Sequence, residues 1–376
     1  MKITAIETFI LHIPVTRHHI EDSTHRLTHW GAPGVIIHTD AGITGYGYTG
    51  THAHLPTDRL ITDCVAAAYA PLLIGEDPRE VRQLHAKLKT FPPIQWVGRS
   101  GITQLALSVV DIALWDIKAK EANLPLWKLL GGGGAQRIQA YNTDGGWLNW
   151  PLATLTENAS QMVKEGYQGI KIKVGSPDPY DDLTRIAAVR QVIGPHIKLM
   201  VDANGKWDLT TARMVGRHFG EYDVYWFEEP LWFDDVKGHA ILAHDLETPI
   251  ALGEQLYTLD AFRDFIQAAA VHVVQADAVR LAGITEWWQV ADLALAYRLP
   301  VVPHIGDMMQ VHLHLCLAHG ACNLLEYIPW LRECFAEPVT VENGYFLVPQ
   351  LPGAGTTLKP TALREYGVGA RHQAIT

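Results

Sequence analysis

The sequence predicts an α/β protein whose second half is a closed barrel of alternating strands and helices, preceded by a smaller α+β unit. Seven short apolar runs in that half each end in a Lys, Asp, Glu or His: GIKIKVG, LMVDAN, YWFEEP, PIALGE, VVQAD, VVPH and LLEY. From Lys173 onward these residues are 29, 26, 26, 23, 27 and 22 positions apart, the length of one strand, loop and helix. A charge at every strand end would destabilise a core but is typical of an active site at the C-terminal mouth of a barrel.

Residues 1–130 are predicted to form the α+β unit. Alternating apolar residues in MKITAIETFILHI and a turn within GVIIHTDAGITGYGYT favour two or three antiparallel strands over residues 1–48. Residues 14–33 show no periodicity and are interpreted as one long loop, a common setting for a lid. From about residue 57 to residue 130 apolar side chains recur at helical spacing, and the glycines at 131–134 then break the chain.

Residues 131–340 are predicted to form the barrel, because eight strand-like runs alternate there with helical segments. The first of these runs is RIQAYNT, and the seven charged runs follow it. Residues 341–376 are rich in turns, and we expect this segment to return to the N-terminal unit.

Composition narrows the classes of function. The formal net charge of -10 argues against a nucleic-acid-binding face. No apolar run reaches the roughly 18 residues of a membrane span, and the alternating N-terminus does not resemble a signal peptide. The four cysteines form no Cys-x-x-Cys pair and suggest no disulfide framework. We therefore expect a cytoplasmic protein with reduced thiols and with neither a nucleic-acid nor a membrane partner.

Three acids end successive strands of the predicted barrel. Asp202, Glu228 and Glu254 would converge, because neighbouring parallel strands lie about 4.8 Å apart. Three carboxylates so close repel one another unless a cation lies among them, and oxygen ligands favour Mg²⁺. The sequence therefore predicts one Mg²⁺ per subunit. The alternative is that each acid caps the helix after its strand.

Two lysines lie on one side of this predicted metal site. Lys171 and Lys173 are two residues apart in one strand, so their side chains point to the same face. A metal and a neighbouring ammonium would lower the pKa of one lysine and make it a usable base. The alternative is a Lys-x-Lys pair that faces solvent on an edge strand, which a closed barrel does not have.

The strands on the other side end in Asp277, His304 and Glu326. A carboxylate beside an imidazole orients the ring and raises its proton affinity, so His304 is a candidate general acid or base. Glu326 is interpreted as a buried, protonated acid that donates to a substrate carboxylate. A structural role is the alternative for both His304 and Glu326.

A metal flanked by two bases suits the removal of a proton next to a carboxylate. The product of that step is an enediolate, whose charge a divalent metal stabilises. If His304 then protonates a β-hydroxyl, water leaves and a 2-keto-3-deoxy acid forms. If it returns a proton to the α-carbon from the other face, the product is an epimer. The residues alone support both outcomes.

The chain resembles the enolase superfamily, in its mandelate racemase subgroup. The resemblance is carried by KIKVG, VDANGKW, FEEP, LGEQ, QADAVRLAGIT and VVPH, in this order and spacing, and it covers essentially the whole chain. It implies a modified TIM barrel, (β/α)₇β, with an N-terminal α+β capping domain. One departure is Ala282, where many relatives have glycine.

The resemblance also implies roles for single residues. Asp202, Glu228 and Glu254 match the metal ligands, and Lys173 matches a base. Lys171 matches a residue that touches the substrate carboxylate. Asp277 and His304 match a catalytic dyad, and Asn204 and Glu326 match positions that contact substrate.

Within the subgroup the chain resembles acid-sugar dehydratases, particularly those that act on talarate and galactarate, through VGRSG, YNTDGGW, VDANGKWD and VHLHL. This implies a Mg²⁺-dependent hydro-lyase of an aldonate or aldarate in carbohydrate catabolism. The alternatives are a racemase or epimerase of a 2-hydroxy acid with the same Lys and His, a cycloisomerase, and a non-catalytic metal-dependent sugar-acid binding protein. The family also implies a homo-oligomer, from dimer to octamer.

Three further residues are expected to bind substrate. Arg17 and Arg26 lie in the 14–33 loop, which is predicted to close over the site and hold the far end of a polyhydroxy acid. Tyr141 lies in the first barrel strand and is expected to line the pocket.

Overall fold

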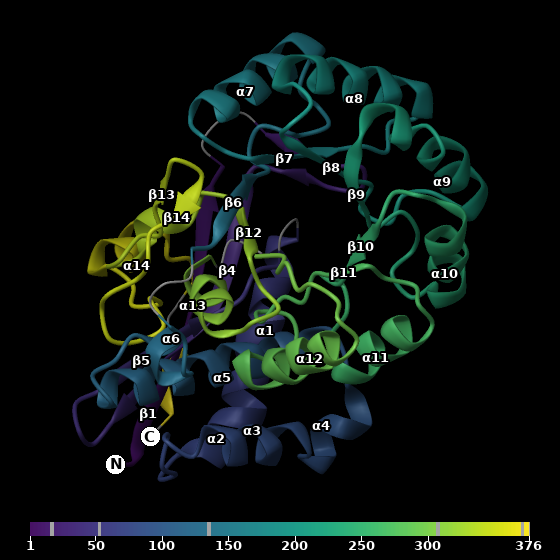
Figure 1. The fold of residues 1–376 in the computed structure, drawn as a ribbon. Coiled ribbons are helices and arrows are strands. Elements are labelled where there is room, and N and C mark those ends of the chain that lie inside the picture. The colour runs from purple at the N-terminus through teal and green to yellow at the C-terminus, as the bar shows by residue number, and fades with distance from the viewer. Residues whose placement is uncertain (16–18, 52–53, 134–136, 306–308, 370–371, 376) are drawn as a thin grey trace.

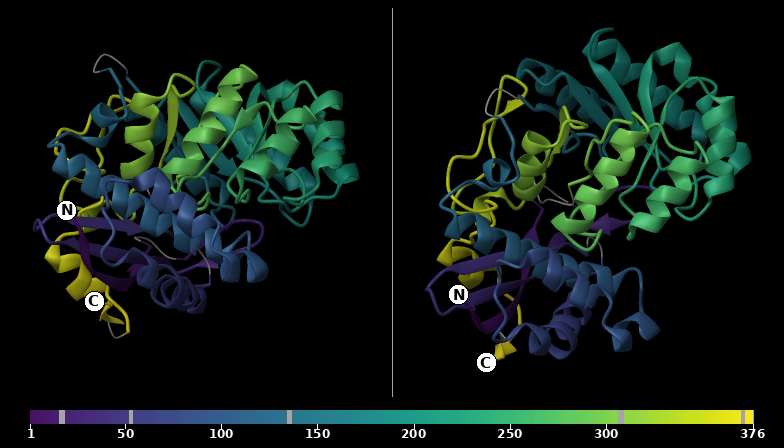
Figure 2. Two further views of the ribbon diagram at one scale, coloured as in Figure 1. Left: turned by 90° about the horizontal axis from the view of Figure 1, so that it is seen from below. Right: turned by 60° about the horizontal axis from the view of Figure 1, so that its bottom comes forward.

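The computed structural model describes all residues except 16–18, 52–53, 134–136, 306–308, 370–371 and 376 (Figure 1). A ring of helices surrounds a central barrel, and the N-terminal unit lies against one end of it (Figure 2). The described residues include no helix that is long and apolar enough to cross a membrane.

The N-terminal unit is built on an antiparallel sheet with the strand order β15-β1-β4-β5. Its strands are β1 (Ile3–Pro14), β4 (His29–Thr39), β5 (Thr44–Tyr48) and β15 (His372–Ile375). The register of β1 and β4 runs from Ile3 opposite Thr39 to Pro14 opposite His29. Because β15 pairs with β1, the end of the chain lies in the same sheet as its beginning.

Helices cover one face of this sheet and pack against the barrel. They are η1 (Leu55–Thr57), α1 (Asp58–Cys64), η2 (Val65–Tyr69), α2 (Ala70–Leu73), α3 (Val81–Lys89), α4 (Pro92–Val97), α5 (Ile102–Glu121) and α6 (Leu126–Leu129). The long helix α5 is apolar on nearly every side because it lies between the sheet and the barrel. Gly47 lets β5 approach α5 closely, since a Cβ there would lie 1.9 Å from the carbonyl oxygen of Val109.

The single loop expected over residues 14–33 was the wrong interpretation. Strand β4 begins at His29, and a small hairpin of β2 (Ile20–Glu21) and β3 (Arg26–Leu27) precedes it. The hairpin turn is closed by Asp22, whose Oδ1 accepts the backbone N–H groups of Thr24 and His25, each at 2.7 Å. Two-residue strands are too short for alternation to reveal them.

The barrel is a parallel sheet in which β6 to β11 are neighbours in chain order. Its strands are β6 (Gln139–Asn142), β7 (Gly169–Lys173), β8 (Lys198–Asp202), β9 (Val224–Glu228), β10 (Ile250–Leu252), β11 (Val273–Val274) and β12 (Leu324–Tyr327). The expected strand at VVPH is reduced to one bridge, between Val274 and Val301. The barrel closes because β12 pairs with β6.

Seven helices follow the first seven barrel positions, and among the described residues no barrel helix follows β12. They are α7 (Leu152–Lys164), α8 (Pro179–Ile193), α9 (Leu209–Gly216), α10 (Val236–Asp245), α11 (Leu259–Gln267), α12 (Ile284–Ala296) and α13 (Met309–Ala318). The expected (β/α)₇β barrel is thus confirmed. The chain continues through η3 (Phe219–Tyr222, before β9), η4 (Arg332–Cys334), β13 (Val341–Glu342), β14 (Tyr345–Phe346) and α14 (Pro360–Tyr366).

The barrel interior below the mouth is filled by a separate apolar cluster. Its members are Tyr141, Met200, Trp226, Ala251, Val273, Val302 and Leu324. This plug leaves the ionisable strand-end residues at the mouth, which faces the N-terminal unit.

Candidate active site

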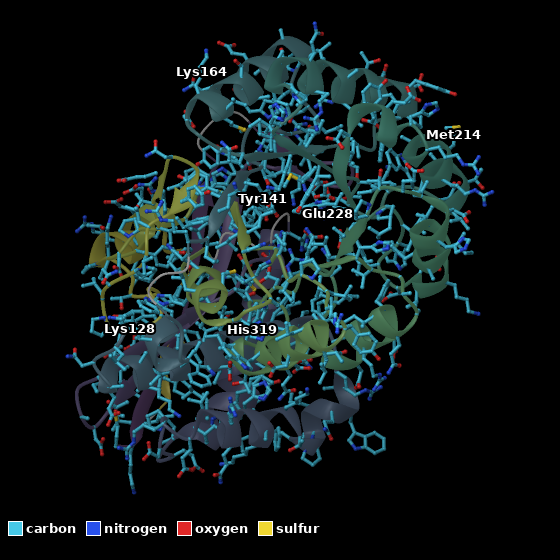
Figure 3. The ribbon with its side chains drawn as sticks, viewed as in Figure 1. Lys128, Tyr141, Lys164, Met214, Glu228 and His319 are labelled. Carbon is cyan, nitrogen blue, oxygen red and sulfur yellow. The ribbon has the colours of Figure 1, made fainter. Side chains whose placement is uncertain are left out.

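Three buried carboxylates meet at the mouth of the barrel. Asp202 ends β8, Glu228 ends β9 directly opposite it, and Glu254 follows β10. One oxygen from each lies within 4.8 Å of the others. Three like charges this close repel one another and could hold a cation, and an all-oxygen set fits Mg²⁺. Figure 3 shows Glu228 inside the ring of helices.

Both lysines of β7 contact these acids. Lys171 is 1% exposed, and its Nζ lies 2.6 Å from Glu228 Oε1 and 3.0 Å from Glu326 Oε1. The Nζ of Lys173 lies 2.5 Å from Asp202 Oδ2. Two-residue spacing in a strand thus brings both ammonium groups to the metal site, as the sequence predicted.

The expected lowering of a lysine pKa is not found with these residues alone. Burial lowers the pKa of Lys173, but Asp202, Asp22 and Glu254 together raise it more, so the pKa lies above its ordinary value. Burial likewise lowers the pKa of Lys171, but Glu228, Glu326 and other nearby groups together raise it well above its ordinary value. A divalent cation on the same carboxylates would compete for their negative charge and reduce this effect.

An imidazole faces the same acids from the opposite side. His304 Nδ1 lies 2.8 Å from Asp277 Oδ2, and its Nε2 lies 3.0 Å from Glu254 Oε2. Asp277 is itself held by the N–H of Val279 at 2.9 Å and lies 3.2 Å from His312 Nε2. Burial lowers the pKa of His304, but Glu254 and Asp277 raise it to about 10. The ring therefore carries a proton near neutral pH.

The neighbours of Glu326 favour a protonation state other than the one expected from the sequence. Burial raises the pKa of this carboxyl, but Lys171, His304 and the hydrogen bond from Thr143 together lower it more, so the pKa lies below its ordinary value. Its Oε1 accepts a hydrogen bond from Thr143 Oγ1 at 2.6 Å. The lowered pKa favours an ionised acceptor over the protonated donor expected from the sequence, because the sequence does not show how close Lys171 lies.

These groups line one cavity of about 300 Å³ between the barrel mouth and the N-terminal unit. The barrel contributes Lys171, Lys173, Asn204, Glu254, His304 and Glu326. The N-terminal unit contributes residues of the β2–β3 hairpin, of β4 and of the start of α5. The backbone of Asn204 has φ +47°, and its N–H donates to Asp202 Oδ1 at 2.9 Å, which fixes its position beside the acids.

Two of the three expected substrate contacts do not line this cavity. Tyr141 is fully buried in the barrel plug beneath the site, where the Lys171 Nζ lies 5.7 Å from its ring centre (Figure 3). Arg26 is exposed, with its Nε 3.5 Å from Glu21 Oε1. Arg17 lies outside the described residues.

Sequence reasoning missed several cavity residues. Arg280 is 4% exposed and lies in the turn after β11. Trp147 places its ring 5.6 Å from Lys173 Nζ. Asp22 and His25 were not missed in this way, because they reach the cavity from the 14–33 segment that the sequence predicts to close over the site. Only Arg280 carried a signal, because it follows a candidate catalytic acid by three residues.

Comparison with known families agrees with this geometry. Residues 154–362 match "Enolase C-terminal domain-like", and residues 5–131 match the "Mandelate racemase / muconate lactonizing enzyme, N-terminal domain". The chain belongs to the mandelate racemase/muconate lactonizing enzyme family of the enolase superfamily. The family resemblance noted in the sequence is thus confirmed, and so is the expected fold class of a barrel with an N-terminal capping domain.

Similar proteins include sugar-acid enzymes of two kinds. L-talarate/galactarate dehydratase of Salmonella typhimurium is 41% identical over 80% of this chain and 74% of its own length. Its crystal structure with Mg and L-lyxarohydroxamate covers 99% of this chain and 94% of its own, with a TM-score of 0.91 at 34% identity. Arabinonate dehydratase of Saccharolobus solfataricus is 31% identical over 88% of this chain and 89% of its own length. 3,6-anhydro-alpha-L-galactonate cycloisomerase of Streptomyces coelicolor is 32% identical over 98% of this chain and all of its own length.

Proposed function

We propose that this protein is a Mg²⁺-dependent dehydratase of a sugar acid, an aldonate or aldarate. The observation that carries the proposal is the arrangement of two proton-transfer groups, Lys173 and His304, on opposite sides of one carboxylate cluster in one cavity. Relatives named as dehydratases of talarate, galactarate and arabinonate support this reaction class.

The residues divide the reaction between them. Lys173 takes the proton from the α-carbon, and the C–H electron pair passes toward the substrate carboxylate. Lys171, fixed between Glu228 and Glu326, places a positive charge beside that carboxylate. A divalent cation held by Asp202, Glu228 and Glu254 would stabilise the negative charge that develops there.

His304 completes the elimination. Its protonated ring donates to the β-hydroxyl, the bond from the β-carbon to oxygen breaks, and water leaves. The electron pair returns to form a double bond between the α- and β-carbons, and the resulting enol becomes the 2-keto-3-deoxy acid when its hydroxyl loses a proton and its β-carbon gains one. Asp277 holds the ring by its Nδ1, which leaves Nε2 on the side of the metal ligands.

The first test is a substrate screen. Purified protein with Mg²⁺ is incubated with four- to six-carbon aldonates and aldarates, and 2-keto acid is read by semicarbazide absorbance. We expect at least one acid to give product, and product formation should depend on Mg²⁺. If Mg²⁺ binds but no acid gives a keto product, dehydration is the wrong reaction.

Epimerisation is the second candidate, because Lys173 and His304 also flank the site as two bases on opposite faces. In that case substrate recovered from D₂O would carry deuterium at the α-carbon and show inverted configuration. No keto acid would accumulate.

A further inference from the structure

His312 is a fully buried histidine of α13, in the VHLHL segment, and it approaches the Asp277–His304 pair from outside the cavity. Its Nε2 lies 2.9 Å from the backbone N of Ala278 and 3.2 Å from Asp277 Oδ1. His312 is not among the residues that line the cavity between the barrel mouth and the N-terminal unit. Any effect of this side chain on the reaction therefore passes through the residues that it contacts.

Only one of these two contacts can be a hydrogen bond. The backbone N–H of Ala278 always carries its hydrogen, so His312 Nε2 accepts that hydrogen bond and bears no proton of its own. The same nitrogen cannot also donate to Asp277, so the 3.2 Å contact is an approach of two acceptors. His312 thus does not neutralise Asp277, and the negative charge of Asp277 remains available to His304.

The bond to Ala278 holds the turn that orients Asp277. Asp277 Oδ1 accepts the N–H of Val279 at 2.9 Å, and this leaves Oδ2 to meet His304 Nδ1 at 2.8 Å. The amide of Ala278 lies between Asp277 and Val279, so a shift of this amide would move both the carboxylate and the N–H that orients it. Ala278 is fully buried, and loss of the His312 ring would leave its N–H without that acceptor, which favours such a shift.

Other side chains fix the two flanks of the same turn. Trp287 Nε1 donates to the carbonyl oxygen of Ala276 at 2.9 Å, and Thr49 Oγ1 donates to the carbonyl oxygen of Val279 at 2.7 Å. His312 holds the middle. Removal of its ring should therefore displace residues 277–278 locally and leave the barrel folded.

We propose that His312 is a positioning residue that holds Asp277 against His304, and that it supports the loss of the β-hydroxyl but not the removal of the α-proton. Lys173 is held separately by Asp202 of β8, so a displacement in the turn after β11 should leave its step largely unchanged. The proposal rests on the proposed function, because that function assigns the two steps to Lys173 and His304.

The test follows both steps by proton NMR in D₂O with Mg²⁺ and a substrate acid. In His312→Leu we expect dehydration to slow about 30- to 100-fold, because small displacements of a catalytic group have large effects on rate. Removal of the α-proton, measured as exchange plus dehydration, should fall less than about 3-fold, and KM should change less than about 2-fold, because His312 does not line the cavity. His312→Gln offers an amide oxygen to the same N–H and should recover at least about 5-fold of the lost rate.

His314→Leu is the matched control. His314 is also fully buried, two residues further along α13, and its Nδ1 accepts the N–H of Trp127 in α6 at 3.2 Å. Loss of this bond should lower Tm without changing the ratio of dehydration to α-proton removal. If His312→Leu does not fold, His312→Asn, whose shorter amide falls short of Ala278, takes its place in each comparison.

An equal fall in both steps would overturn the proposal, and so would a His312→Gln variant that is no more active than His312→Leu. The downfield proton resonance of His304 Nδ1–H needs no turnover and is identified, in protein with isotopically labelled histidine, by its absence from His304→Asn. We expect this resonance in wild type and His314→Leu but not in His312→Leu. If no acid is dehydrated, that pattern would still support the positioning role and reject only the proposed function. An unchanged resonance in His312→Leu would reject the positioning role itself.

Discussion

At the residue scale, the site depends on which carboxylate each cation contacts. Lys171 and Lys173 differ by two positions but pair with different acids, Glu228 and Asp202. His304 is held at both nitrogens by acids from different strands. Each proton-transfer group therefore has its charge state set by a specific neighbour.

The first residue-scale prediction concerns Asp277. Asp277→Asn removes a negative charge 2.8 Å from His304 Nδ1, so the protonated ring is less favoured and its pKa falls. We expect kcat to fall by about 10²–10³-fold and the alkaline limb of its pH profile to move to lower pH. An unchanged alkaline limb would show that His304 is not the acid.

The second concerns the metal ligands. Glu228→Gln removes one of three anionic oxygens and leaves Lys171 with a neutral partner. We expect Mg²⁺ affinity to fall at least about 10-fold by calorimetry and the Mg²⁺-dependent rise in Tm to shrink. Glu229→Gln alters the next residue, which is not among these ligands, and should weaken Mg²⁺ binding less. Equal affinities in wild type and Glu228→Gln would place the ion elsewhere.

At the element scale, the β2–β3 hairpin closes one wall of the cavity and is fastened to the barrel by few bonds. Asn149 accepts the N–H of Glu21 at 3.0 Å and donates to the carbonyl oxygen of His19 at 3.0 Å. Ser23 Oγ donates to the carbonyl oxygen of Ala203 at 2.7 Å, beside the metal site. The hairpin therefore couples the capping unit to the substrate cavity.

Loosening this hairpin should affect binding more than chemistry. Asn149→Ala removes both of its hydrogen bonds, so we expect KM for the sugar acid to rise about 3- to 10-fold while kcat changes less than about 2-fold. Asn323→Ala, another exposed asparagine, is the control. A fall in kcat with KM unchanged would mean that the hairpin takes part in the chemistry.

Residues at the ends of the barrel strands could be predicted to lie in the site, whereas residues positioned by contacts between distant elements could not. Lys171, Asp202, Glu228 and Glu254 could be predicted because strand-end spacing is a local pattern that the parallel barrel turns into proximity. Arg280 could not, because its orientation depends on the distant capping unit. Tyr141 was expected in the pocket, yet its side chain packs in the apolar cluster inside the barrel, below the mouth.

At the scale of the whole molecule, the capping unit and barrel are joined through a buried acid. Asp111 of α5 accepts from the backbone N–H of Thr285 at 2.9 Å and from its Oγ1 at 2.6 Å, at the start of α12. Burial raises the pKa of Asp111 to about 7, although the bonds from Thr285 lower it. The contact also fixes the turn that carries Arg280.

This acid makes a contribution to stability that depends on pH. A folded-state pKa above the ordinary 3.8 means that the contribution is fully present below about pH 4 and is lost as pH rises through 7. In Asp111→Asn, which cannot ionise, the fall in Tm between pH 5 and pH 8 should be smaller than in wild type by a few degrees. Parallel Tm curves for the two proteins would contradict the raised pKa.

The central claim is that the two sides of the site have separate roles, with Lys173 removing the α-proton and His304 expelling the hydroxyl. Proton NMR of a substrate acid in D₂O with Mg²⁺ tests this directly in two variants. In His304→Asn we expect the α-proton to exchange for deuterium without loss of water, and in Lys173→Met we expect neither exchange nor product. Dehydration by Lys173→Met, or exchange in Lys173→Met that is absent from His304→Asn, would contradict the account.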